Sequence, residues 1–492
     1  MIVKKEDLKN KLENYIFMKL NQEEYEIIEC DPRNLLTWNR LITAFDLFYL
    51  DMKDKNDKLA RYVYTERVRA ATLGTFIESD GQKAGIEMYI REFEKTYDSL
   101  RKNGFDPAIS VIPLAKDLSI LNASHRVASA IHLGKSVYCV RTELDPICDD
   151  FKELYRRRVD YNILDIVVQK FIEYSNNTFI AFLWESSRKY HKKIETLFKN
   201  IVYIKNIKLN MNGAYNLLME LYKHMDWIGT AKDNYAGIRQ KLIECFTDFK
   251  GFKIIIFQSN SLNEVRELKD KIRQICKMGY SSIHITDTKE EALRIAKLLL
   301  NENAIHFLNH ANLNKYPNIS KEIANFKNFL SENGADPVDV LIDGSFVLAL
   351  YGLRQSEDID YLINDKYKKF ESDKYNEHSA ELIFHRKSKE DLIYDPRYHF
   401  EYQGIKFISF ASLYEMKKNR SELKDKIDCK IMEAYLRGNK ISLYLRNIEQ
   451  NLLYLIIKTK HRTYKKIITV LKIFNLYEPV RKIYKRLIRI RR

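Results

Sequence analysis

The segment that most constrains this chain is the run Leu-Ile-Asp-Gly-Ser at 341–345, followed a dozen residues later by Glu-Asp-Ile-Asp-Tyr-Leu at 357–362. Side chains alternate along a strand, so Asp358 and Asp360 are expected side by side on one face. Two neighbouring carboxylates repel each other, and Mg²⁺ relieves the repulsion while also binding substrate phosphates. The pattern therefore predicts a metal and phosphate site, with a strand that ends in solvated acids as the alternative.

The residues Gly344-Ser345 and Asp358-Ile359-Asp360 resemble the signature of the nucleotidyltransferase fold of the DNA polymerase beta superfamily, over about residues 330–440. The pattern that continues through Arg354 is most similar to the small bacterial members rather than to template-directed polymerases. The resemblance implies a nucleotide-binding enzyme with Mg²⁺ (or Mn²⁺) on Asp358 and Asp360. It also implies a nucleoside triphosphate or nucleotide-activated donor, with Gly344 and Ser345 at the phosphates.

A third carboxylate is implied on the next strand of this fold. The strand-like run at 380–384 makes Glu381 the candidate for this catalytic position. Glu401, on a hairpin expected over 399–410, is its rival. An ordinary surface carboxylate is the alternative for either residue.

Positive charge for a phosphate is predicted downstream of the acidic pair. At helical spacing Lys417, Arg420 and Lys424 share a face, whereas Leu413, Met416, Leu423 and Ile427 lie on the core side. A solvated face explains the same pattern. Arg354, just before the acidic pair, is the strongest single candidate for a phosphate contact.

A second resemblance lies near the N-terminus, at about residues 100–145. The run Leu-Asn-Ala-Ser-His-Arg at 121–126 is similar to the turn that opens a helix in ParB and sulfiredoxin-like folds. It implies a nucleotide phosphate bound by the helix start, with His125 and Arg126. Ala123 departs from the glycine usual in that turn. The alternative is a helix start that Ser124 caps, with Arg126 paired to an acid.

The length of 492 residues predicts about three domains of mixed α/β and α+β class. We expect a helical and ParB-like module at 1–155, an alternating α/β domain at 156–318, a nucleotidyltransferase-type mixed-sheet domain at 319–440 and a basic tail at 441–492. In the second region, strands are expected at 253–257, 282–286 and 304–308, with helices at 262–278 and 290–301 between them. Such alternation favours parallel pairing.

Most of the net charge of +16 lies in the tail, because residues 453–492 hold thirteen Lys or Arg and one acid. Beyond Pro479, apolar residues recur at helical spacing among the basic ones, which predicts an amphipathic helix suited to an anionic membrane surface. Binding of nucleic acid is the rival. No signal peptide or long uncharged run is present, so a cytoplasmic protein is expected, peripheral at the inner membrane face.

These features favour a Mg²⁺-dependent nucleotidyl- or phospho-group transferase that acts on a small or glycan-linked acceptor in cell-surface polysaccharide biosynthesis. One alternative is a nucleic-acid-binding or defence protein that uses the ParB-like turn and the basic tail. A further alternative is a catalytically inactive nucleotidyltransferase-fold scaffold. The six cysteines form no Cys-x-x-Cys pair, so neither a zinc ribbon nor a disulfide framework is expected.

Overall fold

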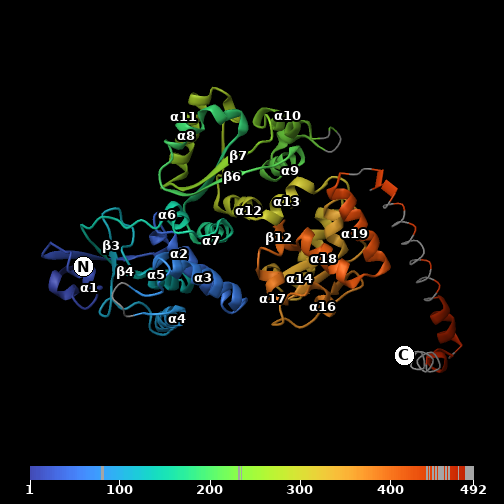
Figure 1. Ribbon diagram of the computed structural model, residues 1–492, viewed down its shortest axis with the longest axis horizontal. Helices are drawn as coiled ribbons and strands as arrows, with labels where there is room; N and C mark the ends of the chain where they lie inside the picture. Colours follow the sequence, from blue (N-terminus) through green and yellow to red (C-terminus); the bar gives the residue numbers. More distant parts are fainter. Residues whose placement is uncertain are drawn as a thin grey trace.

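The computed structural model describes residues 1–78, 83–230, 233, 235–438 and part of 441–481. Helices and three mixed or antiparallel sheets make up this part of the chain, which confirms the general class of α and β multidomain protein. Figure 1 shows the three sheets in succession, from the blue N-terminal part through the green central part to the orange C-terminal part. The predicted tail helix lies largely outside the described residues. In the part that the structure describes, no helix is long and apolar enough to cross a membrane.

The N-terminal part is a four-stranded sheet with helices packed on it. The strand order is β1-β2-β4-β3, antiparallel except for the β3 and β4 pair. Its elements are β1 (Ile2–Lys4), α1 (Asn14–Phe17), β2 (Glu24–Cys30), α2 (Ile42–Met52), α3 (Asp57–Ala71), α4 (Ile86–Asn103), β3 (Ile112–Leu114), α5 (Ser124–Leu133), β4 (Val137–Arg141), α6 (Phe151–Arg156) and α7 (Tyr161–Tyr174). The helix predicted after residue 124 is thus confirmed, and it ends at Gly134 in the left-handed conformation.

The central sheet has the order β6-β7-β5-β8, and all its pairs are antiparallel. The parallel pairing predicted from the alternation of strands and helices is therefore wrong. The elements are β5 (Thr178–Leu183), α8 (His191–Glu195), β6 (Ile201–Ile207), α9 (Met211–Tyr222), α10 (Ala236–Cys245), β7 (Phe252–Gln258), α11 (Leu262–Cys276), β8 (His284–Ile285), α12 (Lys289–Leu299) and α13 (Glu302–His310).

The strand predicted at 304–308 is wrong, because this segment lies inside α13. Its buried residues Ala304, Phe307 and Leu308 are spaced three and four apart, which is a helical period. The side chain of Asn301 accepts a hydrogen bond from the Ala304 N–H and caps the helix. Helices α12 and α13 pack against β12 and so join the central part to the C-terminal part.

The C-terminal sheet has the order β11-β10-β9-β13-β12. Strand β10 is antiparallel to β9 and parallel to β11, and the predicted hairpin is confirmed as the antiparallel pair β12 and β13. The elements are α14 (Ile319–Glu332), β9 (Val340–Asp343), α15 (Ser345–Leu350), β10 (Ile359–Ile363), β11 (Tyr375–Glu377), α16 (Leu382–His385), α17 (Lys389–Tyr394), β12 (His399–Tyr402), β13 (Ile405–Ile408), α18 (Phe410–Arg420) and α19 (Leu423–Leu436).

Candidate functional site

The acidic motif and the glycine-serine turn meet at the end of the pair β9 and β10. The register places Asp360 opposite Asp343, the last residue of β9. Gly344 follows with φ +71° and ψ −152°, a conformation essentially restricted to glycine. A Cβ on Gly344 would lie 2.3 Å from Oδ2 of Asp360. The missing side chain therefore lets the turn lie directly against the Asp360 carboxylate.

The two residues of the acidic pair differ in exposure. Asp358 is exposed just before β10, and the hydroxyl of Ser356 donates to its Oδ1 at 3.1 Å. Asp360 is half-buried, and burial raises its pKa, with Asp358 and Asp343 raising it further while His378 and Lys417 lower it. Like-charge repulsion between neighbouring carboxylates is the condition that a divalent cation relieves.

The carboxylates of Asp358 and Asp360 fit Mg²⁺ in donor chemistry, because hard oxygen ligands are those this ion prefers. In the described residues no group of three or more His, Cys, Asp or Glu side chains is arranged to hold a metal ion. Mg²⁺ is commonly bound through one or two carboxylates together with substrate phosphates and water. The two carboxylates match that kind of site.

Asp343 belongs to a histidine cluster that we did not predict from the sequence. Its Oδ2 lies 2.9 Å from Nδ1 of His378 and 2.9 Å from Nε2 of His385. Burial raises the pKa of Asp343, but His385 and His378 outweigh burial and hold it below its ordinary value. Burial lowers the pKa of His378, but the hydrogen bond and charge of Asp343 outweigh it, and the pKa is raised. The cluster is therefore an ion pair beside Asp360.

The strand that follows β10 is β11 (Tyr375–Glu377), which comes earlier in the chain than the strand expected at 380–384. The register places Asn376 opposite Asp360. The strand predicted at 380–384 is wrong, because this segment forms a 3-10 helix (Ser379–Glu381) and then α16. Oε2 of Glu381 lies 3.4 Å from Nη1 of Arg420, so its nearest charged partner is a cation of α18. A catalytic role for Glu381 stays a prediction.

The rival carboxylate, Glu401, lies on β12 at the opposite edge of the sheet from β11. It forms a 2.9 Å ion pair with Lys297 of α12. This pair links the C-terminal sheet to the central part of the protein. Glu401 thus has a clear structural role away from the acidic pair.

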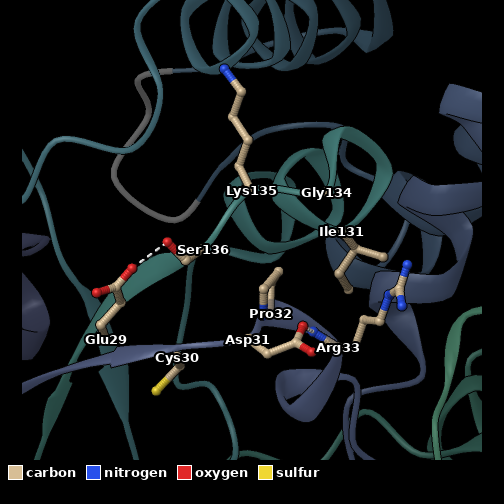
Figure 2. A pocket seen from close by; sticks show the side chains of 9 residues that line it. All are labelled: Glu29, Cys30, Asp31, Pro32, Arg33, Ile131, Gly134, Lys135 and Ser136. Atoms are coloured by element: carbon tan, nitrogen blue, oxygen red, sulfur yellow. Dashed lines mark hydrogen bonds between the residues drawn. The ribbon is translucent and has the colours of Figure 1, made fainter.

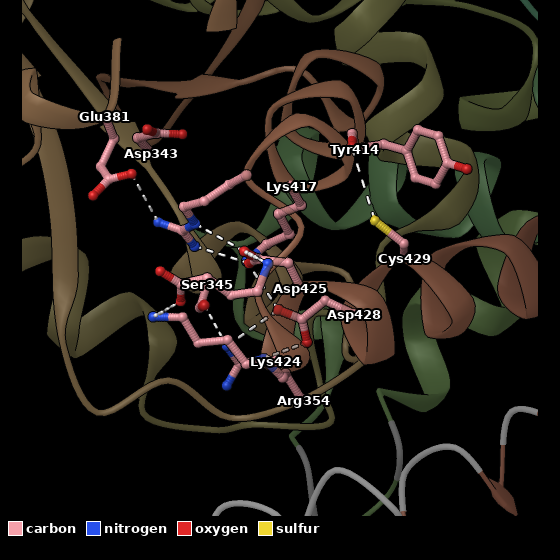
Figure 3. A network of polar contacts seen from close by, with 12 residues as sticks. Asp343, Ser345, Arg354, Glu381, Tyr414, Lys417, Lys424, Asp425, Asp428 and Cys429 are labelled. Atoms are coloured by element: carbon pink, nitrogen blue, oxygen red, sulfur yellow. Dashed lines mark hydrogen bonds and ion pairs between the residues drawn. The ribbon is translucent and has the colours of Figure 1, made fainter. Parts of the chain in front are cut away.

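The predicted cationic face on α18 is divided among different environments, which Figure 3 shows. Lys417 is buried, with Nζ 2.9 Å from Asp428 and 3.4 Å from Asp425. Arg420 binds Asp425 through two hydrogen bonds of 2.8 Å. Helix α18 ends at Arg420, because the following Ser421 adopts a left-handed conformation, and Lys424 belongs to the separate helix α19. The prediction that all three cations share one face is wrong.

The start of α19, the helix that follows α18, also differs from the prediction. Lys424 is exposed and pairs with Glu422 at 3.3 Å. Leu423, expected on the core side, is exposed, whereas Leu413, Met416 and Ile427 are buried as predicted. The cause is the left-handed Ser421, which interrupts the helical phase.

Arg354 connects the glycine-serine turn to the ion-pair network. Its Nη2 donates to the hydroxyl of Ser345, and its Nε lies 3.1 Å from Oδ1 of Asp428. Asp428 thus contacts both Arg354 and Lys417. Sequence analysis missed Asp425 and Asp428, although their spacing of three residues on a helix places them on one face.

The helix start in the N-terminal part is occupied by neighbouring side chains. His125 is half-buried, stacks on Phe93 with ring centroids 4.3 Å apart, and lies 2.9 Å from the Tyr64 hydroxyl. Burial lowers its pKa well below the ordinary value. Arg126 donates to Glu13 at 2.9 Å, so the alternative in which it pairs with an acid is confirmed. Phosphate binding by His125 and Arg126 stays a prediction.

Ala123 and Ser124 complete this helix start. Ala123 adopts φ +76°, the left-handed conformation for which glycine is favoured. The hydroxyl of Ser124 donates to the buried Asp46 at 2.5 Å, and the predicted side-chain cap is not formed. The turn therefore has a left-handed residue at Ala123 and lacks the expected cap.

A cavity of about 500 Å³ lies at the other end of the same helix (Figure 2). Its lining includes Ile131 in the last turns of α5 with Gly134 and Lys135 just after that helix, and Cys30 at the end of β2 with Arg33 just after that strand. It is therefore separated from His125 and Arg126 by the length of α5.

Comparison of the chain with protein-family models, with curated proteins and with solved structures found no match. The site is therefore interpreted from its own residues and their geometry.

Proposed function

We propose that the protein is a Mg²⁺-dependent nucleotidyl- or phospho-group transferase whose ion is held by Asp358 and Asp360. The observation that carries the proposal is the contact between the Gly344 turn and the Asp360 carboxylate, with Asp358 two residues before it. A carboxylate pair beside a backbone without a side chain is the combination that Mg²⁺ and a polyphosphate require, which supports the proposal. Arg354 supports it by donating to the Ser345 hydroxyl.

In this proposal, each residue has a defined task. Bound Mg²⁺ would neutralise charge on the phosphates and on the leaving pyrophosphate. Asp358 and Asp360 hold the ion. Gly344 has no side chain, so the phosphates can approach its backbone closely. Arg354 fixes the orientation of the Ser345 hydroxyl. Lys417 is buried among Asp425 and Asp428 and acts by stabilising the helices behind the site.

The acceptor class remains part of the proposal. A small or glycan-linked acceptor fits the sequence pattern better than a template strand does, because the excess positive charge lies mainly in the tail. Cell-surface polysaccharide biosynthesis is the setting in which such an acceptor and a membrane-associated tail would occur together. Flotation with anionic liposomes tests the tail, and a chain that ends at residue 475 should lose flotation. Equal flotation of the two chains would contradict membrane docking.

The test of the transferase is Mg²⁺-dependent release of pyrophosphate from a set of nucleoside triphosphates, with and without sugar phosphates as acceptors. The wild-type chain should release pyrophosphate, and the double variant Asp358→Asn with Asp360→Asn should lose the activity while retaining its circular dichroism spectrum. Asp373→Asn, an exposed carboxylate between β10 and β11, is the matched control and should retain activity. Full activity in the double variant would refute the assignment.

A catalytically inactive scaffold is the second candidate. The observation that favours it is the pairing of Lys417 and Arg420 with Asp425 and Asp428, which leaves their charge largely compensated. This candidate is favoured if the protein binds nucleotide without any turnover. It is excluded if turnover depends on Asp358 and Asp360.

A further inference from the structure

A second cavity, of about 560 Å³, lies where the N-terminal part meets one end of the central sheet. Strands β5 and β6 begin at this end and β7 ends there, because their pairs are antiparallel. Asn177, Asn200 and Asn260 stand in the loops next to these three strand ends and line one wall. Residues 33–39 and the turn around Asp117 line the opposite wall. We call this cavity the carboxamide cleft.

The lining of the carboxamide cleft is polar and almost neutral. Seven of its fourteen residues are Asn or Gln, with Arg33 as the single cation and Asp117 as the single acid among them. A carboxamide both donates and accepts hydrogen bonds without carrying charge. A matching ligand has many groups that likewise donate and accept hydrogen bonds. Uncharged molecules rich in hydroxyl groups have this property. A lining with one arginine and one aspartate has no net formal charge and gives little attraction for phosphate.

Part of the cleft is held in place by hydrogen bonds between its two walls. Oε1 of Gln258 accepts from the Trp38 backbone N–H at 2.8 Å, and its Nε2 donates to the Leu36 carbonyl at 2.9 Å. Within the second wall, Asn39 donates to Asp117 at 3.0 Å. These bonds give the cleft a fixed frame before any ligand enters, which lowers the entropic cost of binding.

Other carboxamides of the cleft remain available. Within the described residues, the side chains of Asn176, Asn177 and Asn200 make no hydrogen bond, and all three are exposed. Trp38 is half-buried, belongs to the lining and packs in part against the hydrophobic core. An aromatic ring beside polar groups suits a ligand with one apolar and one polar face. A pyranose ring has these two faces.

We propose that the carboxamide cleft binds a neutral sugar, with Asn176, Asn177 and Asn200 on its hydroxyl groups and Trp38 against its ring. The inference does not rest on the proposed transferase, because the cleft lies in other parts of the chain. A bound sugar would contact both walls at once, so the N-terminal and central parts would form the binding site together.

Saturation-transfer difference NMR on the full chain tests the proposal. The probes are the methyl glycosides of glucose, galactose, mannose and N-acetylglucosamine, each at about 10 mM, with uridine and adenosine as the nucleoside arm. At least one glycoside should show transfer. The double variant Asn177→Ala with Asn200→Ala and the variant Trp38→Ala should each weaken binding by at least about tenfold.

Asn162→Ala is the matched control, because Asn162 is an exposed asparagine of α7 outside the cleft. It should bind the same glycoside as the wild-type chain does. Trp38→Ala keeps the backbone N–H that Gln258 accepts, so the frame is retained. The proposal is overturned if no glycoside shows transfer, if transfer is equal in the double variant, or if only the nucleosides bind.

Discussion

Nδ1 of His378 and Oδ2 of Asp343 lie 2.9 Å apart, although 35 residues separate them in the sequence. Asp343 on β9 lies opposite Asp360 on the adjacent strand β10. The contact with His378 therefore forms a charged pair next to Asp360. Nε2 of His385 lies 2.9 Å from the same Asp343 oxygen. An ion pair between residues remote in sequence therefore lies next to Asp360 of the candidate site.

The stability of the C-terminal sheet should depend on pH through His378. Its pKa is raised in the folded protein, so its contribution is fully present below its ordinary value of 6.5 and is lost as the pH rises through the raised value. The urea midpoint of the wild-type chain, followed by circular dichroism, should fall as the pH rises above 6.5. In His378→Gln this fall should be smaller. An identical pH profile for the variant would contradict the charged pair.

The conformation of Gly344 should make its replacement costly. Gly344→Ala puts a Cβ 2.3 Å from Oδ2 of Asp360 in a conformation that only glycine adopts easily. We expect a loss of about 1 to 3 kcal/mol in the free energy of unfolding. The control is Gly334→Ala, where φ is also positive but nothing lies within 4 Å of the added Cβ. Equal losses for the two variants would show that the contact with Asp360 is unimportant.

Removal of the buried Lys417 charge should be more damaging than removal of the nearby Lys424 charge. Lys417→Met leaves Asp425 and Asp428 without one of their cations in a buried setting, which should cost about 3 to 5 kcal/mol. Lys424→Met removes an exposed pair with Glu422 and should change stability by less than about 1 kcal/mol. Denaturant unfolding of both variants measures the difference. Similar small losses would mean that Lys417 is not structurally required.

The local elements of the acidic motif could be predicted from the sequence. The strands around 341 and 360, the hairpin over 399–408 and the helix at 262–276 follow from short-range hydrophobic patterns. Gly344 could be singled out because Gly344-Ser345 with Asp358-Ile359-Asp360 forms a recognisable short pattern. These features depend on residues close to one another in the chain.

Strand direction and the histidine cluster could not be predicted, because both depend on distant pairing. Alternation of strands and helices does not fix how β5, β6 and β7 pair, and they are antiparallel. His378 reaches Asp343 through the parallel pairing of β11 with β10. The apolar run at 382–384 is too short to separate strand from helix, and it became α16.

The central property proposed for the site is that Asp358 and Asp360 hold a divalent cation together with a nucleotide. Electron paramagnetic resonance of Mn²⁺, titrated with the full chain and a non-hydrolysable nucleoside triphosphate, measures this directly. The wild-type chain and Asp373→Asn should bind Mn²⁺ equally, and the Asp358→Asn with Asp360→Asn variant should bind at least about tenfold more weakly. Equal Mn²⁺ binding by all three proteins would contradict the account.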